Sequence, residues 1–254
     1  MEIIFLGTGE AHGMPVGLCD CNLCNEYRKN GKFRSRPSII IKEGDTNLLF
    51  DISPDFRNQI ITNKISKIDA TFVTHAHFDH LDGIGDLYLS KKTNKGPVYL
   101  SKETHEYVMR FFPWIKEEFV ILKDFEERKI ADLSITPFPL EHAKGFETKG
   151  FIIKNKNKKV IYAPDFSKID EKSMKIIGNA NVSILDGQYV LGRYLPDPLH
   201  IDGQELKLIA QKARLKQIYL IGISEHYMQK ETKEIEKQIP EGLFIPSDNQ
   251  KISL

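Results

Sequence analysis

Residues 74–80 have the sequence Thr74-His75-Ala76-His77-Phe78-Asp79-His80, which places three imidazoles and a carboxylate within six positions. The mostly apolar run 70–73 precedes them, so a strand that ends there would deliver these side chains into a tight loop. Neutral imidazole nitrogen and carboxylate oxygen are ligands that suit zinc and related divalent ions. His75 and His77 alternate and can point to one metal, whereas Asp79 and His80 follow the turn and can reach a second.

A metal-free explanation of the same residues is a surface histidine cluster, or histidines that cap a helix beginning near Leu81. The spacing H-x-H-x-D-H argues against this explanation, because it is a specific signal and a lone pair of histidines is not. We therefore expect a loop that binds metal.

All three cysteines of the chain, Cys19, Cys21 and Cys24, also lie within six residues. An odd number in so short a span is a poor disulfide framework. In a reducing compartment the pattern C-x-C-x-x-C favours thiolates gathered on a metal. Such a site needs a fourth ligand from elsewhere to become a closed tetrahedral zinc site. A chance cluster of free thiols is the alternative. We predict a zinc-binding loop over residues 17–26.

The composition is that of an ordinary globular protein, with 254 residues, 41% hydrophobic and 28% charged. We find no linker, repeat or low-complexity stretch, and layered folds reach this length as one unit, so we predict a single domain over residues 1–254. A net charge of +1 argues against binding nucleic acid through a wholly basic surface. The chain has neither a membrane-spanning apolar run nor a secretion signal, so we expect a cytoplasmic protein.

Short strand-like runs alternate with amphipathic segments along the chain. Apolar spacing predicts helical faces within residues 56–61 and 206–210, and Asn155–Asn157 between two apolar runs predicts a hairpin. Periodicity alone supports either an α/β or an α+β fold. The strand-like runs cover residues 2–6, 38–42, 47–52, 70–74, 98–101, 133–136, 151–154, 159–163, 182–185 and 217–223.

The H-x-H-x-D-H motif after an apolar strand resembles the signature of the metallo-β-lactamase superfamily of metal-dependent hydrolases. The resemblance covers nearly the whole chain, through the segments Ile3-Ile4-Phe5-Leu6-Gly7-Thr8-Gly9 and Leu48-Leu49-Phe50-Asp51 and the later residues His142 and Asp165. The cysteine loop after Gly13-Met14-Pro15 makes the chain similar to the phosphodiesterase of the carbon–phosphorus lyase pathway and its relatives. The resemblance implies an α+β fold, the four-layer αββα sandwich.

The resemblance also implies a ligand set for two metals, either Zn²⁺ or Mn²⁺. In that set His75, His77 and His142 hold the first metal, Asp79 and His80 hold the second, and Asp165 bridges them. For Asp165 the alternative is the N-cap of a helix near residues 167–176.

Other carboxylates near the motif are expected to act indirectly. The resemblance implies that Asp51 hydrogen-bonds a histidine or the loop from behind and fixes its orientation. Asp82 and Asp86 are expected at a helix start, where the helix dipole favours them.

One departure from the relatives' pattern concerns residues 218–226. The relatives carry a strand ending in His-x-Ser-His, whose first histidine binds the second active-site metal and whose second completes the cysteine site. Here Gly222 occupies the first position and Glu225 the second, with His226 one place later. We expect His226 to complete the cysteine site, which would leave the second active-site metal weakly bound. The alternative places His226 at the active site.

The candidate catalytic residues are His200 and Asp79. His200 lies in a loop before a predicted helix and matches a histidine that can face the leaving group in the relatives. A general acid there would contribute typically ~10²–10⁴-fold; a solvated loop histidine is the alternative. His12 and His105 are expected at the surface, and His12 is a remote candidate for the fourth ligand of the cysteine site.

The function implied by the resemblance is hydrolysis of a small or cyclic phosphodiester by a metal-activated water. An alternative is tRNA 3′-end processing, but no Gly/Pro-rich arm is evident between Gly85 and Pro139. A further alternative is a one-metal or non-catalytic binding protein whose second site is lost through Gly222. The expected partner is a small-molecule substrate, neither nucleic acid nor a membrane, and the chain could form a homodimer.

Overall fold

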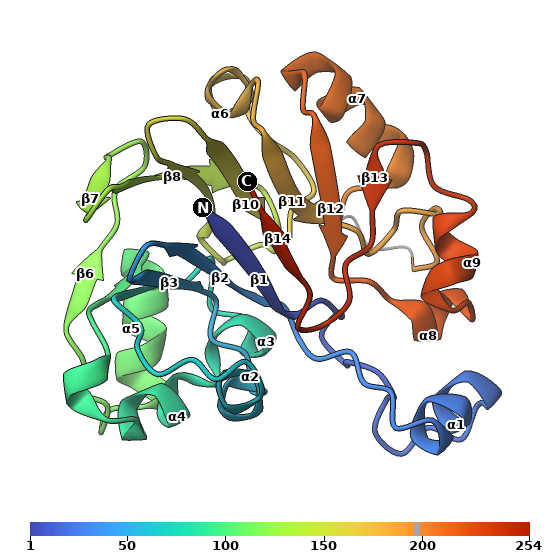
Figure 1. The fold of residues 1–254 in the computed structure, drawn as a ribbon, viewed down its shortest axis with the longest axis horizontal. Coiled ribbons are helices and arrows are strands. Elements are labelled where there is room, and N and C mark those ends of the chain that lie inside the picture. The colour runs from blue at the N-terminus through green and yellow to red at the C-terminus, as the bar shows by residue number, and fades with distance from the viewer. Residues whose placement is uncertain (196–198) are drawn as a thin grey trace.

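Two seven-stranded sheets pack face to face, with helices on their outer faces, in a computed structural model that describes residues 1–195 and 199–254 (Figure 1). Figure 1 shows α2 to α5 beside the first sheet, and α6 and α7 beside the second. The α+β, four-layer αββα arrangement expected from the sequence is confirmed.

The elements have the following bounds. The first sheet has the spatial order β14 (Lys251–Ser253), β1 (Glu2–Gly7), β2 (Ser38–Glu43), β3 (Thr46–Phe50), β4 (Ala70–Phe72), β5 (Val98–Leu100) and β6 (Phe119–Ile121). The second has the order β13 (Leu243–Phe244), β12 (Gln217–Ile221), β11 (Val182–Asp186), β10 (Lys159–Ala163), β9 (Thr148–Lys154), β8 (Leu133–Leu140) and β7 (Arg128–Ile130). The helices are α1 (Asn22–Lys29), α2 (Phe56–Thr62), α3 (Phe78–Leu81), α4 (Ile84–Leu89), α5 (Lys102–Phe111), α6 (Glu171–Ile177), α7 (Gly203–Ala213), α8 (Glu225–Met228), α9 (Thr232–Glu236) and the 3₁₀ helix η1 (Lys92–Asn94).

Aromatic and β-branched side chains fill the space between the sheets. The ring of Phe50 lies 5.2 Å from that of Phe72 in the same sheet and 5.5 Å from that of Phe151 in the other. All three side chains are fully buried, and burying each contributes roughly 1.5–3 kcal/mol. Strands such as β10 and β11 are almost continuously apolar because helices cover their other face. The scaffold therefore has a packed core that does not depend on the polar ligand side chains.

Each sheet changes from antiparallel to parallel pairing along its width. β1 to β3 are antiparallel and β3 to β6 parallel, while β8 to β10 are antiparallel and β10 to β13 parallel. The carboxyl ends of parallel strands lie at one edge of a sheet, where ligands bind in such folds. Asp51, Asp165 and Gly222 each follow one of these ends, after β3, β10 and β12.

Some local predictions need correction. The hairpin at Asn155–Asn157 is confirmed, since β9 and β10 pair antiparallel. The helix expected near residues 167–176 begins at Glu171, and its N-cap is Asp170, whose side chain accepts a hydrogen bond from the Ser173 amide. The N-cap alternative for Asp165 is therefore wrong.

The start of the helices after the motif also differs from expectation. α3 already begins at Phe78, and Asp82 is its C-cap, so only Asp86 lies in a first helical turn. The strands β6, β7, β13 and β14, which are two or three residues long, were not predicted. In the part of the chain that is described, no helix combines the length and the apolar character needed to cross a membrane.

Candidate metal centre

The proposed ligand side chains come from both sheets. The loop after β4 and the short helix α3 carry the H-x-H-x-D-H residues in the first sheet. His142 follows β8 and Asp165 follows β10, both in the second sheet. The packing of the two sheets therefore brings together side chains that are far apart in the chain.

His75, His77, His142 and Asp165 form a first group, whose ligand atoms all lie within 4.8 Å of one another. Nδ1 of His77 lies 2.8 Å from Nε2 of His75 and 3.2 Å from Nε2 of His142. Two nitrogens bound tetrahedrally to one zinc would lie about 3.3 Å apart, given Zn–N distances of about 2.05 Å. The first group therefore has the size of a metal site.

Asp79, His80 and Asp165 form a second group. Nε2 of His80 lies 3.1 Å from Oδ2 of Asp165 and 3.3 Å from Oδ2 of Asp79. The same Oδ2 of Asp165 lies 3.7 Å from Nε2 of His142, so this one oxygen faces both groups. It therefore occupies the position that a bridging ligand would need.

The buried Nε2 atom of His80 tests whether these residues fit a metal. It has no hydrogen-bond partner among the described residues, although two carboxylate oxygens lie close to it. Leaving a buried polar nitrogen without a partner is costly. A cation between this nitrogen and the carboxylates would satisfy all of them, so the donor set fits a divalent metal.

Hydrogen bonds behind the ligands fix the ring orientations. Nδ1 of His80 donates to Oδ2 of Asp51 at 2.8 Å, and Nδ1 of His142 donates to the Leu199 carbonyl oxygen at 2.8 Å. Both rings must then present Nε2 as the nitrogen with the lone pair. Asp51 also accepts hydrogen bonds from the Thr74 amide and from the Tyr162 hydroxyl, each at 2.8 Å. Asp51 thus lies where the resemblance implied.

The electrostatic environment treats the two groups differently. Burial lowers the pKa of His75 well below its ordinary value and that of His77 to about 4, with the neighbouring histidines adding to the effect. Burial alone would also lower the pKa of His80, but Asp165, Asp79 and Asp51 raise it well above the ordinary value. Asp165 is buried too, which opposes ionisation, yet His80 beside it holds its pKa well below the usual range. Without metal, His75 and His77 are therefore neutral and His80 is charged at neutral pH.

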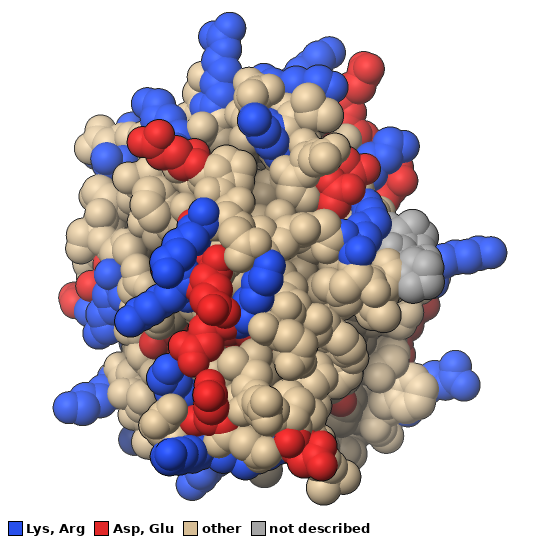
Figure 2. Space-filling view, turned by 90° about the vertical axis from the view of Figure 1, so that its right-hand side faces the viewer, with Lys and Arg blue, Asp and Glu red and all other residues tan. Residues whose placement is uncertain are grey.

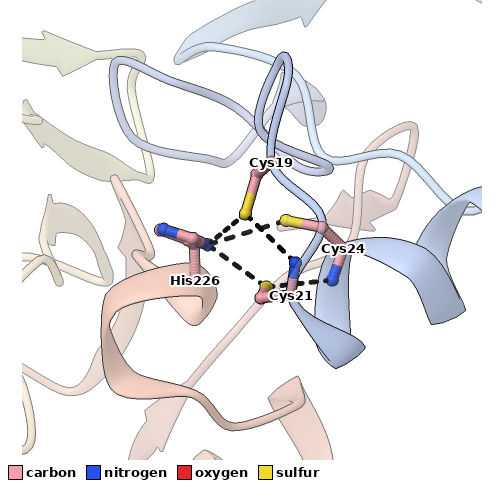
Figure 3. Close-up of side chains that lie close together, drawn as sticks. All are labelled: Cys19, Cys21, Cys24 and His226. Atoms are coloured by element: carbon pink, nitrogen blue, oxygen red, sulfur yellow. Dashed lines mark hydrogen bonds between the residues drawn. The ribbon is translucent and has the colours of Figure 1, made fainter.

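The three cysteines lie around His226. Figure 3 shows their sulfur atoms turned toward this ring, and Nδ1 of His226 lies 3.9, 3.7 and 3.6 Å from Sγ of Cys19, Cys21 and Cys24. A sulfur and a nitrogen bound tetrahedrally to one zinc would lie about 3.6 Å apart, given distances of about 2.3 and 2.05 Å. The Cys24 amide hydrogen bond lowers the pKa of Cys21 to about 6, which favours a thiolate. The four residues fit a closed tetrahedral zinc site.

The strand-end segment 222–226 assigns its residues to different surroundings. His226 lies in α8 and faces the cysteines, so the structure does not place it with the His/Asp groups. Glu225 is fully buried, accepts hydrogen bonds from the Tyr27 hydroxyl at 2.5 Å and from Nε of Arg34 at 3.3 Å, and faces neither cluster. At Gly222 (φ 72°) nothing lies within 4 Å of where a Cβ atom would be. The space that a histidine there would fill is open.

His200 is buried, with Nδ1 2.7 Å from Oδ2 of Asp186. Its ring lies 4.9 Å from that of His142, and Asp186 and His200 have ligand atoms within 4.8 Å of Asp165. The alternative of a solvated loop histidine is therefore wrong. Sequence reasoning missed Asp186, although it ends the apolar run of β11 in the same way that Asp165 follows β10.

A cavity of about 300 Å³ opens beside the His/Asp groups. Its lining combines ligand residues with side chains from the segment after β1 and from the neighbourhood of α8. The lining residues that are described are Glu10, Ala11, His12, Pro37, His77, Phe78, Asp79, His142, Asp165, Gln188, Leu195, Leu199, His200, Gly222 and Tyr227. A larger cavity of about 640 Å³ between α6 and α7 contains none of the proposed ligands.

The two histidines expected at the surface differ. His12 is half-exposed, but it lines the cavity, and its Nδ1 lies 2.9 Å from Oε2 of Glu10 and not among the cysteines. His226 thus occupies the place for which His12 was a remote candidate. His105, on α5, is partly buried with its ring 5.2 Å from that of Phe119.

Residues 46–223, more than half of the chain, match the protein family described as the beta-lactamase superfamily domain. Among solved structures, a diphosphatase from the PhnP family has a TM-score of 0.85 and 27% identity, and the match covers 100% of this chain and 97% of that one. The zinc-bound PqqB of Methylobacterium extorquens has a TM-score of 0.84 at 19% identity, over 100% of both chains, which shows likeness of fold.

Curated relatives match over different lengths. An octanoyltransferase from Porphyromonas gingivalis is 29% identical over 57% of this chain and 31% of its own length. A ribonuclease Z from Thermococcus sibiricus is 30% identical over 69% of this chain and 54% of its own length. This chain thus spans about a third to a half of these two relatives. A ribonuclease Z from Pyrococcus horikoshii is 24% identical over 100% of this chain and 96% of its own length.

Proposed function

The chain belongs to the beta-lactamase superfamily, and on that premise we propose that it is a metal-dependent hydrolase of small phosphodiesters. The observation that carries the proposal is the position of Oδ2 of Asp165, which faces the first group and the second group at once. His75, His77 and His142 would hold one divalent metal, Asp79 and His80 a second, and Asp165 both. When bound there, zinc or manganese would supply Lewis acidity toward phosphoryl oxygens and lower the pKa of water.

The protein's own residues would supply orientation and proton transfer. Asp51 and the Leu199 carbonyl fix the rings of His80 and His142, so that these ligands need no reorganisation. His200 would protonate the leaving oxygen, because its bond to Asp186 fixes the ring and directs proton exchange to Nε2. The carboxylate of Asp186 would stabilise the charged form of this imidazole before transfer.

Two findings favour a small phosphodiester over other substrates of the superfamily. The solved relative that matches the whole chain at 27% identity is a diphosphatase of the PhnP family, the family implied by the cysteine loop. The cavity beside the His/Asp groups has a volume of about 300 Å³, which suits a small molecule. We propose that Cys19, Cys21, Cys24 and His226 hold a structural zinc, and that residues 1–254 act as one domain.

The ribonuclease Z relatives favour a second candidate, processing of the tRNA 3′ end. Against it, the alignment with the Pyrococcus horikoshii enzyme extends over 313 positions, so that enzyme has segments without counterpart in these 254 residues. On the face shown in Figure 2, Lys and Arg are interspersed with Asp and Glu, whereas a polynucleotide prefers a continuous positive surface. A one-metal binding protein, suggested by Gly222, is the remaining candidate.

The test uses protein freed of metal by chelation and then reconstituted with Zn²⁺ or Mn²⁺. Bis(p-nitrophenyl) phosphate, a thioester, a lactone and a precursor tRNA are assayed in parallel, with metal counted per chain by elemental analysis. We expect hydrolysis of the phosphodiester that requires metal. Cleavage of the tRNA alone would instead support the second candidate, and metal binding without any turnover would support a binding protein.

A further inference from the structure

One wall of the cavity carries polar groups to which no role has yet been given. Glu10 and His12 follow β1, and an isolated bridge between Gly9 and Ile223 places this segment beside Gly222. Glu10, His12, Gly222 and Tyr227 line the same cavity as Asp79 and Asp165. This wall therefore lies within reach of a molecule that contacts the metal ligands.

Glu10 and His12 form a fixed pair. Nδ1 of His12 lies 2.9 Å from Oε2 and 3.1 Å from Oε1 of Glu10, whose side chain is only 6% exposed. The carboxylate thus holds the ring by Nδ1, so the other ring nitrogen is the one that can meet a ligand. The arrangement repeats that of His200 and Asp186 elsewhere in the cavity. A carboxylate that orients an imidazole in this way defines a hydrogen-bonding direction.

Two further features give this wall room and a flat surface. Nothing lies within 4 Å of where a Cβ atom of Gly222 would be, so the floor beside the pair is open. The ring of Tyr227 lies edge-on to His12 at 5.6 Å, and it stacks on Tyr194 at 5.1 Å. An aromatic ring with donors and acceptors beside it suits a ring-shaped ligand with hydroxyl groups.

The charges of the lining exclude a second anionic group. Neither Lys nor Arg occurs among the described residues that line the cavity, whereas Glu10 and Asp79 do. Arg36 reaches the Ala11 carbonyl oxygen at 3.1 Å, but it is paired with Asp55 at 3.2 Å. A further phosphate at this wall would lose water without gaining a cation, which is costly.

We propose that Glu10, His12, Gly222 and Tyr227 form a subsite for an uncharged, hydroxyl-bearing ring, such as a ribose, that is a substituent of the phosphodiester. His12, oriented by Glu10, hydrogen-bonds a hydroxyl group, and Tyr227 covers the face of the ring. This deepens the proposed function and rests on it for the phosphate, but the binding of the ring alone can be measured separately.

The first experiment measures binding to the full-length protein without turnover. Saturation-transfer NMR compares methyl β-D-ribofuranoside with tetrahydrofuran, a ring of the same size without hydroxyl groups. We expect saturation of the ribofuranoside only, reduced at least about threefold in Glu10→Gln and His12→Gln, since a hydrogen bond is lost. His105→Gln, a histidine outside the cavity, is the matched control. Equal saturation of both probes, or signals unchanged in both variants, would overturn the subsite.

The second experiment connects the subsite to catalysis. In the metal-reconstituted enzyme, kcat/KM for uridine 5′-(p-nitrophenyl phosphate) should exceed that for bis(p-nitrophenyl) phosphate by about tenfold, the effect of one good hydrogen bond. His12→Gln should bring this ratio toward one, and His105→Gln should not. A ratio near one in the unaltered enzyme would overturn the assignment. If neither diester is cleaved while the ribofuranoside still binds, the proposed function fails and the subsite stands.

Discussion

The two clusters of metal-binding residues are built in opposite ways. The His/Asp centre takes its ligands from strand ends in both sheets, above a core of aromatic rings that is packed without them. The Cys/His cluster takes three ligands from the loop around α1 and one from α8, and only a small group of apolar residues surrounds it. In the first cluster the scaffold positions the metal, and in the second the metal would position the scaffold. The same kind of substitution should therefore have different consequences in the two.

The largest effect on activity is expected in the first cluster. His77→Ala removes a ligand of the first metal and should lower kcat/KM by at least about 10³-fold, equivalent to about 4 kcal/mol. The circular dichroism spectrum and melting temperature should stay close to those of the unaltered protein, because the core is untouched. His105→Ala serves as control. Near-normal turnover by the His77 variant would mean that the ligands have been assigned wrongly.

The second cluster should show the reverse. Cys21→Ser should leave most of the activity and remove about one zinc per chain, because metal affinity at such a site is folding free energy. Releasing the link between α1 and α8 resembles the loss of a cross-link, about 2–3 kcal/mol. For a chain of this size that lowers the melting temperature by about 5–10 °C. Elemental analysis and calorimetry measure both quantities, and unchanged zinc content would refute a structural site.

Within the first cluster, pH should separate the two metals. His75 and His77 have lowered pKa values, that of His77 being about 4, so they add no pH dependence to metal binding between pH 6 and 8. His80 has a raised pKa and must lose its proton before Nε2 can bind. Below that pKa, affinity for the second metal should rise about tenfold per pH unit, since one proton is displaced. Titration calorimetry in two buffers of different ionisation enthalpy counts this proton, and no release would contradict the assignment.

The smallest expected effect concerns Gly222. Gly222→His should tighten the second metal by about tenfold if the imidazole becomes a further ligand in the open space. The positive φ of 72° opposes the change by roughly 1–2 kcal/mol, so the thermal stability should fall slightly. Gly222→Ala is the matched control, because it has the strain without the ligand. Equal metal affinity in the two variants would show that the space does not face the second metal.

Local patterns determine how much of this architecture can be predicted. The H-x-H-x-D-H motif follows one strand, so its spacing in sequence is also its spacing in space. Asp186 escaped prediction because its significance arises only when β11 lies beside β10 and its partner His200 returns from a distant loop. Glu10 and His12 escaped for the same reason, since the bridge of Gly9 to Ile223 gives no signal in the sequence. The edge strands β13 and β14 are too short to show a period of two.

The hydrogen bond from Tyr162 to Asp51 joins the two sheets directly beneath the ligands, since Tyr162 belongs to β10 and Asp51 follows β3. Because Asp51 also holds Nδ1 of His80, the orientation of that ligand depends on the spacing of the sheets. The metal centre would thus act as a gauge of the sandwich. In a cobalt-substituted protein, compression or warming that alters the inter-sheet distance should shift the visible absorption bands before the sheets separate.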